Sequence, residues 1–180
     1  MFRWIGKTRK VTRQIPTPNE ESYRLPTIAF DASSVTDTIK DDLRNNIQLL
    51  EEIDASQFDM VYEAALRSIA KGRALHVLFD ALMTIEGMGK RRASAISLSL
   101  NNKATALIEV QRCLELGIEY ATWRYSGAPC GNPEQDATHK GANGKSYLIA
   151  QGMLLDGRWT HPGYEDECKC FSKPIVPGFT

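Results

Sequence analysis

Apolar residues recur every three or four positions between residues 35 and 117, the spacing that places them on one face of an amphipathic helix. The first such stripe consists of Ile39, Leu43, Ile47, Leu50 and Ile53. A second stripe, over residues 58–69, follows Asp54 and Ser56, either of which suits a helix N-cap. It ends near Gly72, where glycine can take the left-handed conformation that closes a helix. The pattern therefore predicts two helices in this stretch.

Two further helices are predicted in the same region. Residues 73–85 carry one apolar stripe, and a longer helix begins at Lys90 after a short glycine-containing connection. The buried face of this longest helix is expected to consist of Ile96, Leu100, Ala104, Leu107, Val110 and Leu114. Asn101-Asn102 lowers the helix propensity in its middle, so we expect a bend or a break there. Residues 35–117 are thus predicted to form a mainly helical bundle of about four helices.

The apolar period changes from 3.6 to 2 after the fourth helix. Residues 120–124 alternate as in a short strand, and residues 145–150 form a second candidate strand. Asp156-Gly157 is typical of the type I′ turn of a β-hairpin. Residues 171–179 contain two prolines and are predicted to run extended along the surface. The fold class is therefore α+β, with a helical domain followed by a small β-rich cap at residues 118–180.

The first 34 residues have no apolar stripe and contain prolines at positions 16, 18 and 26, so we expect an extended arm. Its beginning is basic and contains Arg3, Lys7, Arg9, Lys10 and Arg13. Over the whole chain 22 basic residues balance 22 acidic ones, so the overall charge gives no argument for a nucleic-acid partner. No apolar run approaches the roughly 20 residues that a transmembrane helix needs, so we expect no membrane association.

Three cysteines and a histidine in the cap form the strongest chemical signal. The start of the chain shows no signal-peptide pattern, so we expect a reducing compartment, in which cysteines serve as thiols or metal ligands. The candidate zinc ligands are Cys130, His139, Cys168 and Cys170, with His161 as a spare. Three thiolates and one imidazole satisfy tetrahedral zinc, and such a site would stabilise a β cap that is poor in apolar residues.

Two alternatives to bound zinc stay open. The four residues can be a metal-free remnant of a zinc site, or Cys130 can form a disulfide with Cys168 or Cys170 after oxidation. A catalytic role is not expected, because the residues that follow Cys130 and His139 lack the Glu and the Pro-Cys-x-x-Cys of zinc deaminases. We therefore predict that the protein is not an enzyme. Cys113 is interpreted as a buried free thiol on the fourth helix.

The connection at Gly87-Met88-Gly89 resembles a helix-hairpin-helix, in which a Gly-hydrophobe-Gly turn points backbone N–H groups at a DNA phosphate. Lys90, Arg91 and Arg92 would add charge-assisted contacts that are independent of the DNA sequence. The alternative is an ordinary connection whose following helix begins with basic residues. Sequence-independent DNA binding, with Gly87, Gly89 and the three basic residues as contacts, is thus the second hypothesis for function.

The stretch from about residue 46 to residue 177 contains several short motifs in a characteristic order. They are Arg91-Arg92-Ala93, Leu116-Gly117-Ile118, Trp123, Cys130, His139, Gly144-Lys145 and Cys168-Lys169-Cys170. This order resembles the phage Mu protein F family of minor head, or head-morphogenesis, proteins. The chain departs from the family pattern in two places: eight residues separate Cys130 from His139, and Lys169 replaces the usual arginine.

The resemblance implies a structural minor head protein of a tailed bacteriophage that acts in head morphogenesis. It implies association with the portal protein or the major capsid protein, and a contact with packaged DNA. The expected location is the virion head, after assembly in the host cytoplasm.

Overall fold

The computed structural model describes residues 35–176 and residue 178. The expected N-terminal arm, residues 1–34, lies outside this part of the chain. Four helices come first: α1 (Asp37–Gln48), α2 (Phe58–Ala70), α3 (Leu75–Leu82) and α4 (Lys90–Glu115). No helix of the described part is both long enough and apolar enough to cross a membrane.

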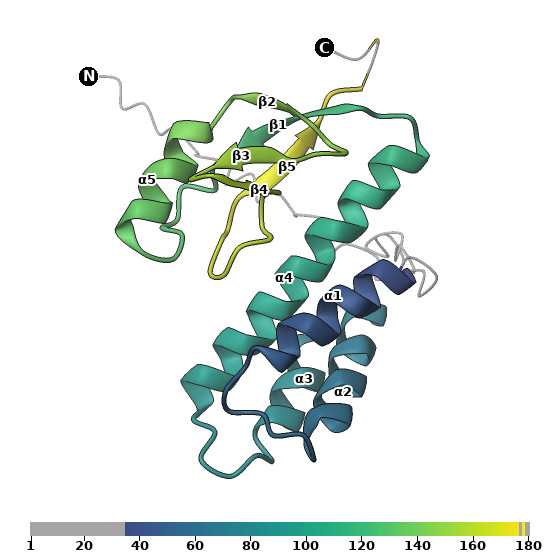
Figure 1. The fold of residues 1–180 in the computed structure, drawn as a ribbon, viewed down its shortest axis with the longest axis vertical. Coiled ribbons are helices and arrows are strands. Elements are labelled where there is room, and N and C mark those ends of the chain that lie inside the picture. Colours follow the sequence, from purple (N-terminus) through teal and green to yellow (C-terminus); the bar gives the residue numbers. More distant parts are fainter. Residues whose placement is uncertain (1–34, 177, 179–180) are drawn as a thin grey trace, which may run out of the picture.

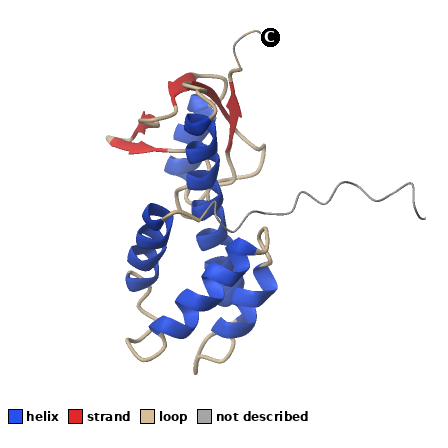
Figure 2. Cartoon of the chain, turned by 90° about the vertical axis from the view of Figure 1, so that its right-hand side faces the viewer, coloured by secondary structure: helices blue, strands red, loops and turns tan. Residues whose placement is uncertain are grey.

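The long helix α4 connects two halves of the molecule (Figures 1 and 2). Its first half packs with α1, α2 and α3, and its second half carries a module of short strands and one helix. We call residues 37–115 the helical domain and residues 118–176 the β module. The predicted α+β class is confirmed, and the prediction of about four helices omitted one helix of the β module.

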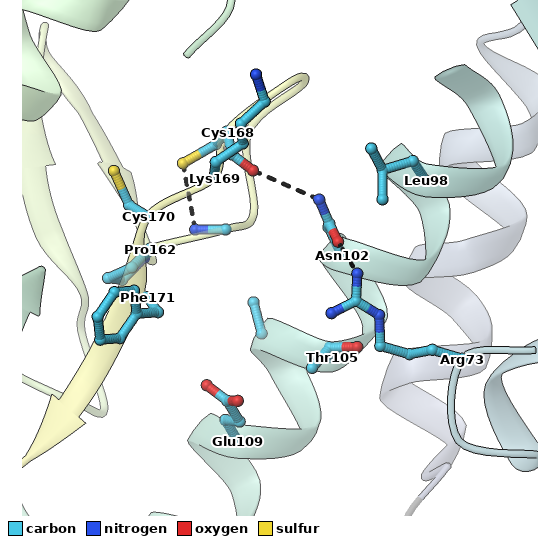
Figure 3. Close-up of a pocket in the computed structure, with 12 residues that line it drawn as sticks. Arg73, Leu98, Asn102, Thr105, Glu109, Pro162, Cys168, Lys169, Cys170 and Phe171 are labelled. Carbon is cyan, nitrogen blue, oxygen red and sulfur yellow. Dashed lines mark hydrogen bonds between the residues drawn. The ribbon is translucent and has the colours of Figure 1, made fainter. Parts of the chain in front are cut away.

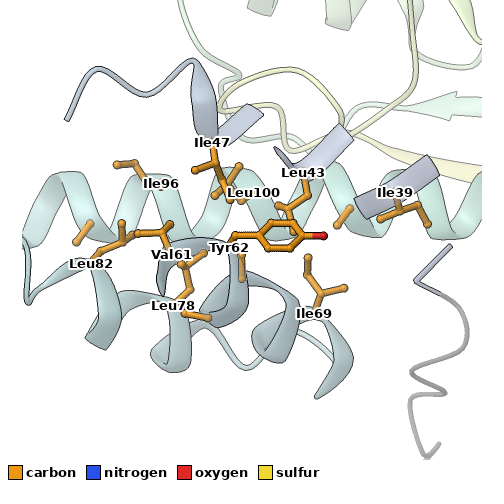
Figure 4. Close-up of a cluster of buried hydrophobic side chains, with 14 of the residues drawn as sticks. Ile39, Leu43, Ile47, Val61, Tyr62, Ile69, Leu78, Leu82, Ile96 and Leu100 are labelled. Carbon is orange, nitrogen blue, oxygen red and sulfur yellow. The ribbon is translucent and has the colours of Figure 1, made fainter. Parts of the chain in front are cut away.

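The helical domain has one hydrophobic core (Figure 4). Its members include Ile39, Leu43, Ile47, Val61, Tyr62, Ile69, Leu78, Leu82, Ile96 and Leu100. Leu50 and Ile53, which were expected on the first helix, lie beyond its end at Gln48. They still pack against the core, because two turns follow the helix. In these turns the N–H of Leu50 donates to the carbonyl of Ile47, and the N–H of Ile53 donates to the carbonyl of Leu50.

The expected break at Asn101 is wrong, since α4 is one uninterrupted helix of 26 residues. Asn101 is fully buried, its Nδ2 donates to the carbonyl of Ser97 at 2.9 Å, and its Oδ1 lies 3.1 Å from the Ser68 hydroxyl. Because its polar atoms have partners, the low helix propensity of asparagine is outweighed. Leu114 was expected to be buried but is 41% exposed, because α4 here presents the face with Val110 and Cys113 to the β module.

The β module contains a three-stranded antiparallel sheet in the order β2-β1-β5 and a separate hairpin, β3-β4. Its elements are β1 (Tyr120–Arg124), α5 (Pro133–Ala142), β2 (Ser146–Leu148), β3 (Met153–Leu155), β4 (Arg158–Thr160) and β5 (Phe171–Pro174). The hairpin turn is type I′ as predicted, since Asp156 and Gly157 have φ of 49° and 78°. The segment 171–179, which was expected to run extended along the surface, begins with β5, an edge strand that pairs with β1.

Helix α5 was not predicted, because it carries no apolar stripe. Its start nevertheless follows ordinary capping rules: Asn132 is the N-cap and accepts a hydrogen bond from the N–H of Gln135 at 2.9 Å, and Pro133 is the first helical residue. The second core of the molecule lies between α5, the sheet and the end of α4, and Trp123 is its largest fully buried side chain.

Candidate metal centre

The four predicted ligands come together in the second core. Cys130 lies in the loop between β1 and α5, His139 lies on α5, and Cys168 and Cys170 lie in the loop just before β5. All four are buried, and one donor atom from each lies within 4.8 Å of the others. The long spacing between Cys130 and His139 is explained by α5, which fills the gap and returns the imidazole to the cysteine. Figure 3 shows the sulfur atoms of Cys168 and Cys170 on the side of their loop that faces away from α4.

Three of the six distances between the donor atoms are close to the edges of a tetrahedral metal site, and all six are at most 4.8 Å. Cys130 Sγ and Cys170 Sγ lie 3.7 Å apart, and His139 Nδ1 lies 3.4 Å from Cys168 Sγ and 3.8 Å from Cys170 Sγ. A tetrahedral zinc ion, with Zn–S of about 2.3 Å and Zn–N of about 2.0 to 2.1 Å, separates two sulfurs by about 3.8 Å and a sulfur from a nitrogen by about 3.6 Å. The site therefore has the size that a four-coordinate metal ion requires.

The imidazole of His139 has its two nitrogens in different surroundings. Nδ1 faces the cysteine sulfurs, and Nε2 lies 3.2 Å from the carboxylate of Glu165. If Nε2–H donates to Glu165, Nδ1 carries the lone pair and is the metal ligand. Sequence reasoning missed Glu165, because nothing in the acidic run at residues 165–167 distinguishes it from its two exposed neighbours.

Backbone N–H groups face two of the sulfurs. The N–H of Gly163 donates to Cys168 Sγ at 3.3 Å, and the N–H of Lys169 donates to Cys130 Sγ at 3.4 Å. Gly163 has φ of 85°, and a Cβ there would lie 3.3 Å from the carbonyl oxygen of Cys170, so the turn favours glycine. The Lys169 ammonium also donates to the carbonyl of Pro129 at 2.9 Å, which ties the two cysteine-bearing loops together. The N–H of Gly163 contributes to the lowered pKa of Cys168.

The pKa values of the clustered cysteines and histidine are shifted by their mutual hydrogen bonds and by burial. The pKa of Cys168 is lowered to about 4, mainly by a hydrogen bond from Cys170. Burial opposes this shift, and hydrogen bonds from His139 and from backbone N–H groups add to it. Burial alone would lower the pKa of His139, but hydrogen bonds to Cys168 and Cys130 raise it to about 9. The hydrogen bond to Cys168, burial and nearby negative charge raise the pKa of Cys170. The lowered pKa of Cys168 and the raised pKa of His139 favour a thiolate beside an imidazolium, and a cation would balance further thiolates.

His161, the spare candidate, lies outside the cluster of four donors. Its ring centroid is 6.3 Å from that of Tyr147, and burial lowers its pKa. A Cβ on Gly152 would lie 3.2 Å from the ring, so His161 fills space beside the β3-β4 hairpin. The remaining histidine, His76, is exposed on α3.

The glycine-rich turn precedes the first residue of α4 (Figure 1), whereas the candidate metal centre lies beside the middle of this helix, where Asn102 bonds to Cys168. Gly87 has φ of 82°, Met88 is buried, and Gly89 is the N-cap of α4. Lys90 and Arg91 are exposed. Arg92 instead forms a two-point ion pair with Glu52, with Nε–Oε1 of 2.5 Å and Nη2–Oε2 of 3.1 Å.

Comparisons with known proteins assign no family to this chain. No protein-family model matches it, and no solved structure matches it. An uncharacterised protein from Haemophilus influenzae is 21% identical to it over 158 residues, which cover 88% of this chain and 34% of that protein. The chain thus spans about a third of the length of this curated relative.

Proposed function

We propose that this chain is a non-enzymatic structural protein whose β module is stabilised by zinc, and that it serves as a minor head protein of a tailed bacteriophage. The observation that carries the proposal is the closed donor set of Cys130, His139, Cys168 and Cys170. Structural zinc sites use four protein ligands, whereas catalytic sites use three and keep a position for water or substrate.

Zinc would be held by three sulfurs and by Nδ1 of His139, and it would supply the positive charge that three buried thiolates need. The β module has a small apolar core built around Trp123 and short strands of three to five residues. Metal binding would therefore contribute directly to its folding free energy.

The phage assignment rests on the order of the motifs. In the resembling family a long helix that opens with Arg-Arg-Ala leads into a β module with paired cysteine and histidine residues, and this chain has the same arrangement in α4 and the β module. The partners we propose are the portal protein and the major capsid protein. We place the protein in the virion head, after assembly in the host cytoplasm.

Mass spectrometry of purified phage particles tests this assignment. We expect the chain in particles at a fixed ratio to the portal protein. We also expect Cys168→Ser to reduce its incorporation, whereas Cys113→Ser, which changes a cysteine outside the metal centre, leaves incorporation unchanged. Particles that assemble normally and lack the chain would overturn the proposal.

Sequence-independent DNA binding is a second candidate, favoured by the exposed Lys90 and Arg91 beside the uncapped N-terminus of α4. The pairing of Arg92 with Glu52 weakens it, because it neutralises one of the three cations. Changing Lys90 and Arg91 to Glu should abolish salt-sensitive DNA retention under this hypothesis. Lys71→Glu, at an exposed position in another turn of the helical domain, is the matched control.

A further inference from the structure

The loop that carries the last two metal ligands also holds the helical domain. We call residues 161–170 the metal loop. Inside the β module it presents Cys168, Cys170 and the carboxylate of Glu165 to the metal centre. On its other side it reaches two helices that lie far away in the sequence, α1 and α4.

Tyr164 makes the contact with α1. Its hydroxyl donates to Asp42 Oδ1 at 2.5 Å, and Asn46 Nδ2 donates to the other oxygen of the same carboxylate at 3.0 Å. The Lys103 ammonium lies 5.9 Å from the centroid of the Tyr164 ring and donates to Asn46 Oδ1 at 2.7 Å. A single tyrosine of the metal loop thus joins a polar network that spans α1 and α4.

Asp166 makes the contact with α4. Its Oδ1 accepts hydrogen bonds from Ser99 Oγ at 2.8 Å and from Lys103 Nζ at 2.9 Å. Further along the loop, Asn102 Nδ2 donates to the carbonyl of Cys168 at 3.5 Å, and Asn102 Oδ1 accepts from Arg73 at 2.6 Å (Figure 3). Residues that serve the metal centre therefore alternate with residues that bind the helices.

The contacts of Tyr164, Asp166 and Cys168 with α1 and α4 are hydrogen bonds, and two cavities lie beside them. A cavity of about 320 Å³ lies between α4 and the end of the metal loop, lined among others by Asn102, Glu109 and Phe171. A second cavity of about 270 Å³ lies between α1, α4 and the Asp166 side of the loop. Ordering the ten residues of the metal loop costs more conformational entropy than a few hydrogen bonds offset. These hydrogen bonds can therefore hold the loop against α1 and α4 only if the loop is already ordered.

We propose that metal binding couples the two halves of the molecule: the metal orders the metal loop, and Tyr164 and Asp166 hold α1 and α4 only while the loop is ordered. This inference rests on the proposed metal site. It adds that occupancy of the site is transmitted to α1, outside the β module. The metal thereby sets how firmly the helical domain is fixed to the β module.

Hydrogen exchange of the full chain, followed by mass spectrometry with and without zinc, tests the coupling. Removing zinc should speed exchange of the α1 amides by about tenfold or more, as expected for losing hydrogen bonds to a charged group. Asp42→Ala should bind one zinc and show fast α1 exchange even when loaded. Asp41→Ala is the matched control, because Asp41 is the exposed neighbour on the same helix and pairs only with Arg44 among the described side chains.

The two failures are distinguishable. If the wild-type chain binds zinc but α1 exchange does not change on its removal, or if Asp42→Ala and Asp41→Ala behave alike, the coupling is wrong and the metal site stands. If the wild-type chain takes up no zinc, the metal site itself is wrong.

Discussion

Three of the four candidate metal ligands have a contact from a neighbouring group outside the donor set. Backbone N–H groups of Gly163 and Lys169 face two of the sulfurs, and Glu165 fixes the orientation of the His139 ring. Outer contacts of this kind set the tautomer of a histidine ligand and the basicity of its donor atom. The strength of the site should therefore respond to changes at residues that never touch the metal.

Cys168→Ser should destabilise the zinc-loaded protein by at least about 2 kcal/mol, because it removes a ligand and leaves buried polar groups without partners. Cys113→Ser should cost less than about 1 kcal/mol, since Cys113 is half-buried and not part of the cluster. Urea unfolding of both variants in zinc-containing buffer gives the comparison. Equal losses would argue against a metal at this site.

Glu165→Gln should lower the affinity for zinc by about tenfold, and Glu165→Ala by up to about 100-fold, because the carboxylate orients His139. Competition against a chromogenic chelator measures the affinity. Glu167→Gln removes the same charge from an exposed neighbour and should have no effect. An equal weakening by Glu165→Gln and Glu167→Gln would show that charge alone, not orientation of the ring, is responsible.

Tyr164 should titrate abnormally. Burial and its hydrogen bond to the Asp42 carboxylate raise its pKa to about 12. Because the folded pKa exceeds the usual value of about 10, its stabilising contribution is complete below pH 10 and is lost as pH rises through 12. Tyrosinate absorbance, with Tyr164→Phe to identify the signal, measures this. Asp42→Ala should lower the pKa of Tyr164, and an unchanged titration would contradict the contact.

At the scale of elements, α4 determines the architecture, because α1 to α3 pack on one half of it and the β module on the other. Its middle contains the buried Asn101, which bonds to Ser97 and faces Ser68 of α2. This polar contact inside an apolar core fixes where α2 meets α4.

Asn101→Ala should destabilise the protein by about 2 kcal/mol, since it leaves Ser68 without this partner and opens a cavity in the core. Urea unfolding measures the loss. Gln111→Ala, at an exposed position of the same helix, should change stability by less than about 0.5 kcal/mol. A small effect at both positions would mean that the contact with Ser68 contributes little.

Helices and strands can be predicted from the sequence where burial of one face makes apolar residues recur at a regular spacing. The stripes of α1 to α4 and the turn at Asp156-Gly157 were recognised because their patterns are local. Helix α5 and strand β5 were missed because α5 is polar on most faces and β5 is an edge strand whose pairing with β1 depends on residues fifty positions away. The four candidate ligands could be predicted because cysteine and histidine are typical metal ligands. Glu165 could not be predicted, because its contact with His139 is evident only in three dimensions.

At the scale of the whole molecule, the two candidate functional regions lie along the same helix, α4. The glycine turn precedes its first residue, Lys90, whereas the loop that carries Cys168 and Cys170 contacts the middle of the helix at Ser99, Asn102 and Lys103. The metal centre lies in the β module and reaches α1 through the metal loop. The molecule is thus organised as a helical domain and a β module that are joined by the long helix α4 and by the contacts of one loop.

The most direct test of this account is the metal content of the full chain purified without chelator, measured by mass spectrometry of the ions. The account predicts about one zinc per chain, retained by Cys113→Ser and lost by Cys168→Ser. Less than about a tenth of an equivalent in the wild-type chain, also after incubation with zinc under reducing conditions, would contradict it.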